Sequence, residues 1–147
     1  MINTKIFAHR GASAYAPENT MEAFKLAIKQ NADGIEIDVH LTKDNHVVVI
    51  HDETIDRVSN GKGFVRDYTL EELRQFSYNY NFNQYENVKI PTLEDVLELI
   101  KPTNLILNIE LKTNFLWYEN IEEIVLSIVD KFEMQDRIIY SSFNHYS

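Results

Sequence analysis

Short hydrophobic runs alternate with amphipathic helical patterns along this chain of 147 residues. The hydrophobic runs lie at residues 6–8, 35–39, 47–50, 105–111 and 137–142. Apolar residues recur at the spacing of an α-helix over residues 21–28, 93–100 and 121–132. Strands that alternate with helices in this way are typical of βα units in a parallel sheet. We therefore predict an α/β fold with five strands.

Two connections between these elements carry local signals. Lys43, Asp44 and Asn45 predict a turn between the second and third strands, because Asn tolerates the positive φ that such a turn often needs. Asn19 is followed three residues later by Glu22, which resembles a capping box at the start of the first helix.

Residues 53–89 interrupt the alternation. This segment contains Gly61 and Gly63, a short helix capped at Thr69, and a polar, aromatic run over residues 78–85 without a strong period. We interpret it as an excursion between regular units, so residues 1–147 are expected to form a single domain.

Polar side chains share one face of two predicted strands. The second strand sets Glu36, Asp38 and His40 opposite its apolar residues. The fourth strand repeats the pattern with Asn108, Glu110 and Lys112. In an antiparallel sheet this alternation indicates a strand with one solvated face, whereas parallel strands covered by helices read as continuous apolar runs. Two strands that both break the parallel pattern on one face favour a functional face.

The carboxylates on this face predict a cation site. Glu36 and Asp38 lie about 6.6 Å apart along their strand, and the longer Glu side chain lets both carboxylates reach a similar height. With Glu110 they would form an all-oxygen site, which suits Mg²⁺ or Ca²⁺ rather than Zn²⁺. Without a cation, the three carboxylates would repel one another and raise their own pKa values.

Two histidines and two cations complete the candidate chemistry. His9 and His51 end predicted strands, which is where a βα barrel places its catalytic groups, and imidazole transfers protons near neutral pH. A structural role is the alternative for each histidine, and it is the one we favour for His40. Arg10 and Lys112 are candidate phosphate ligands, with a surface ion pair as the alternative.

Composition narrows the classes of partner. The chain has 14 basic and 23 acidic residues, and the resulting net charge of −9 disfavours binding to nucleic acid or anionic lipid. It has no Cys, which excludes disulfides and thiolate metal sites. No apolar run approaches the ~18 residues of a membrane span, and the N-terminus lacks a signal-peptide pattern. We therefore expect a cytoplasmic protein without a membrane anchor.

Taken together, these residues resemble the glycerophosphodiester phosphodiesterase family, within the superfamily of phospholipase C-like phosphodiesterases. The matching segments run in order along nearly the whole chain: His9-Arg10-Gly11, Pro17-Glu18-Asn19-Thr20, Gly34-Ile35-Glu36-Ile37-Asp38-Val39, Thr42-Lys43-Asp44, His51-Asp52, Arg57, Gly61-Lys62-Gly63, Ile90-Pro91-Thr92-Leu93, Asn108-Ile109-Glu110-Leu111-Lys112 and Ser142-Phe143. Asn45 and Ser59 depart from the pattern, where the family usually has Gly and Thr, and neither belongs to the candidate chemistry.

The resemblance implies a TIM-type barrel that hydrolyses small-molecule glycerophosphodiesters to glycerol 3-phosphate and an alcohol. It assigns the divalent cation to Glu36, Asp38 and Glu110, and phosphate contacts to Arg10 and Lys112. It makes His9 and His51 the general acid and base, and leaves open which histidine plays which part. In this family the glycerol 2-hydroxyl is thought to attack phosphorus, and water then opens the cyclic phosphate that forms.

The number of predicted strands falls short of a complete barrel. An eight-stranded barrel typically takes about 250 residues, whereas this sequence predicts about five of the eight βα units. We therefore expect a C-terminally truncated barrel domain whose open sheet edges favour self-association. The alternatives to an enzyme are a cation-binding fragment without catalysis and an interaction module completed by another chain. Within the enzyme class, the alternative is a related phospholipase-type phosphodiesterase that acts on a lipid headgroup.

Overall fold

The computed structural model of the protein describes residues 4–113 and 115–144. The two ends of the expected domain, residues 1 and 147, lie outside the described residues. The strands are β1 (Phe7–His9), β2 (Gly34–Leu41), β3 (Val47–Val49), β4 (Ile106–Leu111) and β5 (Ile138–Ser141). The α-helices are α1 (Met21–Lys29), α2 (Leu70–Leu73), α3 (Leu93–Ile100) and α4 (Ile121–Phe132). Short 3₁₀ helices cover Val65–Asp67 and Gln135–Arg137.

Four of the five strands form a parallel sheet in the order β1-β2-β4-β5. Each connection between neighbouring parallel strands contains an α-helix, which is the βα alternation predicted from the sequence. The open sheet is a TIM-type arrangement of βα units that spans part of a barrel. The predicted fold class is therefore confirmed.

The fifth strand, β3, differs from the expected plan because it pairs with β2 in the antiparallel direction. Only residues 42–46 separate the two strands, and Asn45 has a φ of 60° in this turn. A connection of five residues suffices for a hairpin, whereas a parallel crossover needs a dozen residues or more. The consecutive parallel arc therefore consists of β1, β2, β4 and β5, and the expectation that residues 47–50 belong to it is wrong.

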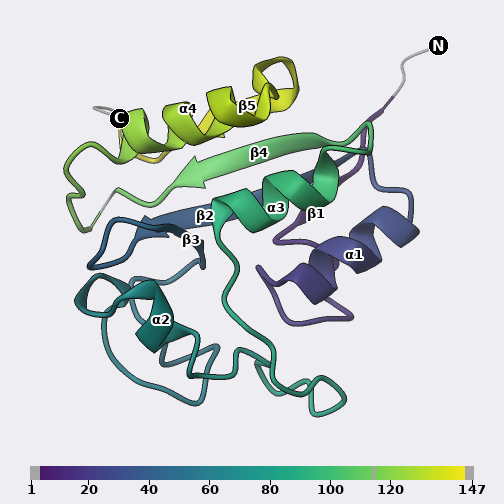
Figure 1. Cartoon of the computed structure of the whole chain (residues 1–147). Coiled ribbons are helices and arrows are strands. Elements are labelled where there is room, and N and C mark those ends of the chain that lie inside the picture. The colour runs from purple at the N-terminus through teal and green to yellow at the C-terminus, as the bar shows by residue number, and fades with distance from the viewer. Residues whose placement is uncertain (1–3, 114, 145–147) are drawn as a thin grey trace.

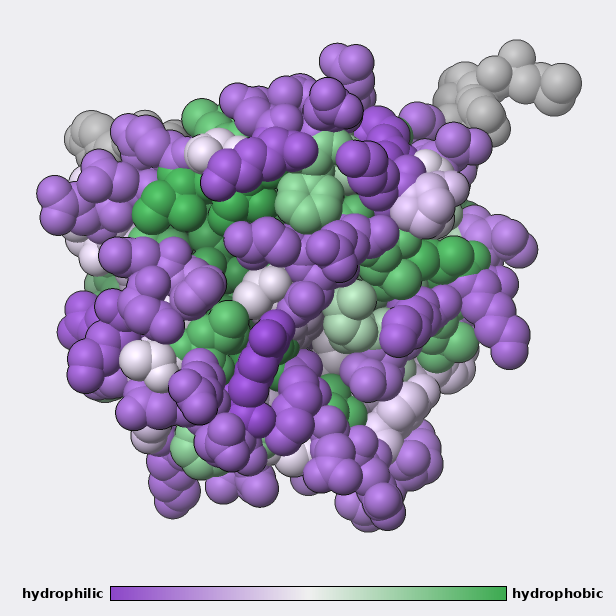
Figure 2. All heavy atoms as spheres, viewed as in Figure 1, coloured by the Kyte–Doolittle hydropathy of each residue, from purple (hydrophilic) through white to green (hydrophobic). Residues whose placement is uncertain are grey.

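The hydrophobic core lies between the sheet and its helices. Ile35, Ile37 and Val39 of β2 pack with apolar side chains of β4, α1, α3 and α4. Figure 1 shows α3 between α1 and α4 along the sheet. Because strand side chains alternate between faces, Glu36 and Asp38 point away from this core. In the view of Figure 2, polar side chains cover most of the surface of the molecule, and apolar ones show between them.

Residues 53–89 pack around a second, smaller cluster next to β3. Val48 and Ile50 extend into this cluster, while Val47 and Val49 face the main core. Its other buried members are Ile55, Val58, Val65, Leu73, Tyr78, Val88 and Ile90. The strand β3 therefore anchors the segment to the sheet. The interpretation of residues 53–89 as an excursion within one domain stays a prediction.

Candidate active site

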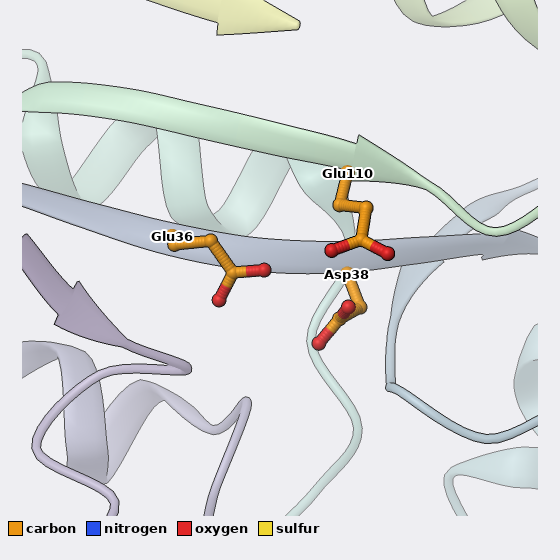
Figure 3. A group of neighbouring side chains, drawn as sticks. All are labelled: Glu36, Asp38 and Glu110. Carbon is orange, nitrogen blue, oxygen red and sulfur yellow. The ribbon is translucent and has the colours of Figure 1, made fainter. Parts of the chain in front are cut away.

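Three carboxylates meet on the sheet face opposite the helices. Glu36 and Asp38 come from β2 and Glu110 from β4, and the register of the two strands sets Asp38 beside Glu110. One oxygen atom of each carboxylate lies within 4.8 Å of the others. Figure 3 shows the three side chains extending to the same side of the sheet. Asp38 is 1% exposed and Glu36 is 8% exposed, so solvent screens their charges poorly.

Burial and like charges act together on Glu36. Burial, followed by the neighbouring Asp38 carboxylate, raises the pKa of Glu36 to about 7. One carboxylate oxygen of Glu36 accepts a hydrogen bond of 3.1 Å from the backbone N–H of Arg10. The other oxygen, Oε1, is buried and has no hydrogen-bond partner among the described residues. The structure thus agrees with the expectation that the cluster raises the pKa of a carboxylate, and it leaves one oxygen for a cation.

Two cationic side chains flank the carboxylates. Lys112 Nζ lies 2.9 Å from a Glu110 oxygen and 3.5 Å from an Asp38 oxygen. Arg10 Nε lies 3.5 Å from the other Asp38 oxygen, and Arg10 Nη1 donates to Glu18 at 3.0 Å. Both cationic side chains are largely buried, so these are not surface ion pairs. Arg10 and Lys112 therefore lie where they could contact an anionic group bound at the carboxylates.

The end of β1 brings Arg10 into this position. Arg10 has a φ of 60° and Gly11 a φ of 77°, so two successive residues adopt left-handed backbone conformations. The turn lets the Arg10 N–H donate to the backbone oxygen of Glu36 at 3.0 Å, as well as to the Glu36 side chain. At Gly11, a Cβ atom would lie only 2.8 Å from the backbone carbon of Ala23. Glycine at this position is therefore required by both conformation and space.

His9 and His51 approach the site from different segments. His9 Nε2 lies 3.8 Å from a Glu36 oxygen, and the His9 side chain is exposed. His51 lies two residues after the end of β3, and Ile50, which lies between them, donates its N–H to the backbone oxygen of Asp38. The expectation that His51 ends a parallel strand is wrong. His51 reaches the height of Asp38 because the β2–β3 hairpin returns the chain along β2.

His51 and Lys112 line one pocket of about 100 Å³. Its other lining residues are Asp52, Glu53 and Phe115. A pocket bordered by an imidazole and a lysine next to the carboxylates has room for part of a small ligand.

His40 has the structural role favoured from the sequence. It is fully buried, with Nε2 at 3.1 Å from the backbone oxygen of His51 and Nδ1 at 2.8 Å from the hydroxyl of Tyr118. A carbonyl oxygen only accepts, so Nε2 carries the proton and Nδ1 accepts from Tyr118. Burial is the largest influence on the pKa of His40 and lowers it, which keeps the ring neutral. His40 therefore supports the backbone of His51.

Sequence reasoning gave no site role to Glu18, Asn19, Asp52 or Arg57. Asn19 Nδ2 donates to an Asp38 oxygen at 2.9 Å, and Asn19 Oδ1 is buried without a hydrogen-bond partner in the described part of the chain. The predicted helix cap at Asn19 is wrong, because Thr20 caps α1 instead. All four residues belong to segments that match the family, at positions 17–20, 51–52 and 57. The sequence does not reveal which side chains they contact.

In residues 4–113 and 115–144, no helix has the length and apolar character needed to cross a membrane.

Comparisons with known proteins agree with this geometry. Residues 9–147 match the model of the glycerophosphoryl diester phosphodiesterase family. A glycerophosphodiester phosphodiesterase from Caldanaerobacter subterraneus subsp. tengcongensis is 48% identical over 147 residues, which are 99% of this chain and 60% of the relative.

Two solved structures share the fold. A glycerophosphodiester phosphodiesterase from Agrobacterium tumefaciens superposes with a TM-score of 0.89 at 35% identity, covering 98% of this chain and 60% of that one. An Oleispira antarctica phosphodiesterase, solved in complex with the product sn-glycerol-3-phosphate, superposes with a TM-score of 0.87 at 34% identity, covering 97% and 59%. The chain thus spans about 60% of the length of these proteins. It belongs to the glycerophosphoryl diester phosphodiesterase family.

Proposed function

We propose that this chain carries the catalytic groups of a metal-dependent enzyme that hydrolyses glycerophosphodiesters to glycerol 3-phosphate and an alcohol. The observation that carries the proposal is the meeting of three carboxylates, two cations and two histidines at one end of the parallel sheet. Family membership supports this reaction class, and so does the product bound to the Oleispira antarctica neighbour.

The donor set fits a hard divalent cation. Three carboxylates supply only oxygen, and the buried Glu36 Oε1 lacks a hydrogen-bond partner in the described structure. Glu36, Asp38 and Glu110 would hold Mg²⁺ or Ca²⁺, both of which prefer oxygen ligands. When bound, the cation neutralises phosphate charge and makes a coordinated hydroxyl more acidic.

Arg10 and Lys112 bind and orient the phosphate group in this proposal. Each already lies within 3.5 Å of an Asp38 oxygen, so each is held at the centre of the site. The guanidinium group of Arg10 can present a planar pair of donors to phosphate oxygens, and Lys112 supplies a compact positive charge.

His9 and His51 move the protons. One imidazole removes the proton of the glycerol 2-hydroxyl as its oxygen attacks phosphorus, and the other donates a proton to the departing alcohol oxygen. The resulting cyclic phosphate is opened by water with the proton transfers reversed. Exposure of His9 and the position of His51 on the pocket beside Lys112 support these roles.

The test is release of glycerol 3-phosphate from glycerophosphocholine, with Mg²⁺ or Ca²⁺ and with excess chelator. We expect turnover that chelator abolishes and that falls by at least about 100-fold in His9→Ala, the range of general acid–base contributions. His46→Ala is the matched control, because His46 is a half-exposed residue of the β2–β3 turn. Turnover that persists with chelator or in His9→Ala would overturn the mechanism. Cation binding without turnover would favour a cation-binding chain that lacks catalysis.

A further inference from the structure

We infer that Arg57 is a positioning residue, which joins the loop carrying Arg10 to the loop carrying His51 and fixes the His51 imidazole through Asp52. The catalytic consequence of this inference rests on the proposed function. The structural part rests only on the contacts of the described residues.

Arg57 uses each of its guanidinium nitrogens to bridge two carboxylates. Its Nε and Nη2 donate to the two oxygens of Asp52 at 2.8 and 3.1 Å. Its Nη1 and Nη2 donate to the two oxygens of Glu18 at 2.9 and 2.8 Å. The Tyr80 ring lies against the guanidinium, 5.2 Å from its central carbon to the ring centroid. This bidentate geometry on both sides is specific to arginine, because a lysine ammonium cannot reproduce it.

On one side, the bridge ends at His51. Asp52 Oδ1 lies 2.7 Å from His51 Nδ1. Although burial raises the pKa of Asp52, hydrogen bonds from Arg57 and His51 outweigh it and hold this pKa at about 2. An ionised carboxylate only accepts hydrogen bonds, so Nδ1 of His51 must carry the proton. The neutral ring then keeps the lone pair of Nε2 free for a proton from the substrate.

On the other side, the bridge ends at the phosphate-binding candidate. Glu18 Oε1 accepts from Arg57 and also from Arg10 Nη1 at 3.0 Å. The Glu18 side chain is only 11% exposed, so its charge requires these partners. Through Glu18, Arg57 constrains the side chain that lies 3.5 Å from Asp38. One residue outside the carboxylate cluster thus constrains both a proton-transfer group and a phosphate contact.

The experiment is to read the tautomer of His51 from the ¹⁵N shifts of its ring nitrogens at a pH where the ring is neutral. In the unmodified chain we expect the proton on Nδ1. Because free imidazole side chains favour Nε2–H, Arg57→Gln should shift His51 toward that tautomer, and Asp52→Ala should do so fully. Arg57→Lys keeps the charge without the bidentate geometry and should resemble Arg57→Gln. It also replaces Arg57→Gln if that variant fails to fold.

Arg74→Gln is the matched control, because Arg74 forms a similarly exposed ion pair of 2.7 Å with Asp95 away from the site. It should leave the His51 tautomer unchanged. An unchanged tautomer in folded Arg57→Gln or Arg57→Lys would overturn the inference.

Turnover measured on the same samples separates this inference from the proposed function. We expect kcat for glycerophosphocholine to fall about 10-fold to 100-fold in Arg57→Gln, the usual effect of losing a residue that orients a site, and to stay unchanged in Arg74→Gln. If the unmodified chain releases no glycerol 3-phosphate, the proposed function fails. The tautomer comparison still decides the role of Arg57.

Discussion

The ionised form of the Glu36 carboxylate would be stabilised by a bound cation. Its carboxylate is buried and lies close to two others, and both conditions favour the protonated form. Binding a cation requires the ionised form. The pKa of about 7 means that Glu36 exchanges its proton in the pH range where the protein would bind its cation.

This property predicts how stability depends on pH in the protein free of divalent cations. The pKa of Glu36 rises from 4.5 in the unfolded chain to about 7 in the folded one. Between these values the folded state binds more protons, so the contribution of Glu36 to stability is complete below pH 4.5 and is lost as pH rises through 7. The loss is on the order of 3 kcal/mol at most.

Thermal unfolding in chelator between pH 4.5 and 8 measures this effect. Glu36→Gln should remove the decline with rising pH, because the amide does not titrate. Glu22→Gln, a substitution on helix α1, serves as the control. The same decline in the unmodified chain and in Glu36→Gln would contradict the assignment.

At this scale the sequence was informative wherever strand geometry determines the neighbours. Glu36, Asp38 and Glu110 could be grouped because side chains alternate along a strand and both strands carry their polar residues on one face. The structure places the two strands side by side. Asn19 could not be placed, because its φ of 54° turns it out of the helix start and toward Asp38. Loop residues of this kind depend on backbone conformations that local sequence patterns do not determine.

At the scale of elements, the turn after β1 and the β2–β3 hairpin build the site together. Residues 34–36 of β2 pair with β1, and residues 39–41 pair with β3. Because β4 pairs along the opposite edge of β2, β1 and β3 pair with the same edge of β2, one after the other along its length. His9 leaves this edge where β1 ends, and His51 arrives at it where β3 ends.

The turn after β1 predicts a marked effect of Gly11→Ala. An added Cβ would lie 2.8 Å from backbone and side-chain carbon atoms of Ala23, and the φ of 77° disfavours alanine. We expect a loss of about 1–3 kcal/mol in the free energy of unfolding, as is typical of a strained backbone position. Urea denaturation measures it.

Gly61→Ala is the matched control. A Cβ at Gly61 would meet the ends of the Ile55 and Phe76 side chains, which can move, and the φ of Gly61 lies outside the left-handed region. It should therefore cost less than Gly11→Ala. Equal losses in the two variants would show that the turn after β1 is not the constrained element proposed here.

The positions of the strands followed well from hydrophobic runs, since all five described strands lie within the predicted limits or extend beyond them by two residues at most at either end. The antiparallel direction of β3 could not be predicted from its hydrophobic run. A run such as residues 47–50 has the same composition whether it pairs in the parallel or the antiparallel direction, and only the length of the preceding turn distinguishes the two.

At the scale of the whole molecule, helices cover one face of the sheet and the acidic site lies on the other face. Helices α1, α3 and α4 contribute to the core on one face, and the polar face carries the candidate chemistry. In the described sheet, β1 and β5 each pair on one side only. The chain spans about 60% of the length of its relatives, and its described residues bring the three carboxylates close to Arg10, Lys112 and the two histidines.

The central claim is that β2 and β4 together form one divalent-cation site. Isothermal titration calorimetry with Mg²⁺ and with Ca²⁺ tests it most directly. We predict one bound cation per chain, with affinity lowered more than about 10-fold in Asp38→Asn, because a hard cation loses an anionic oxygen ligand. Asp130→Asn, a substitution on helix α4, should bind as the unmodified chain does. Absence of binding, or equal affinities in Asp38→Asn and the unmodified chain, would contradict the account.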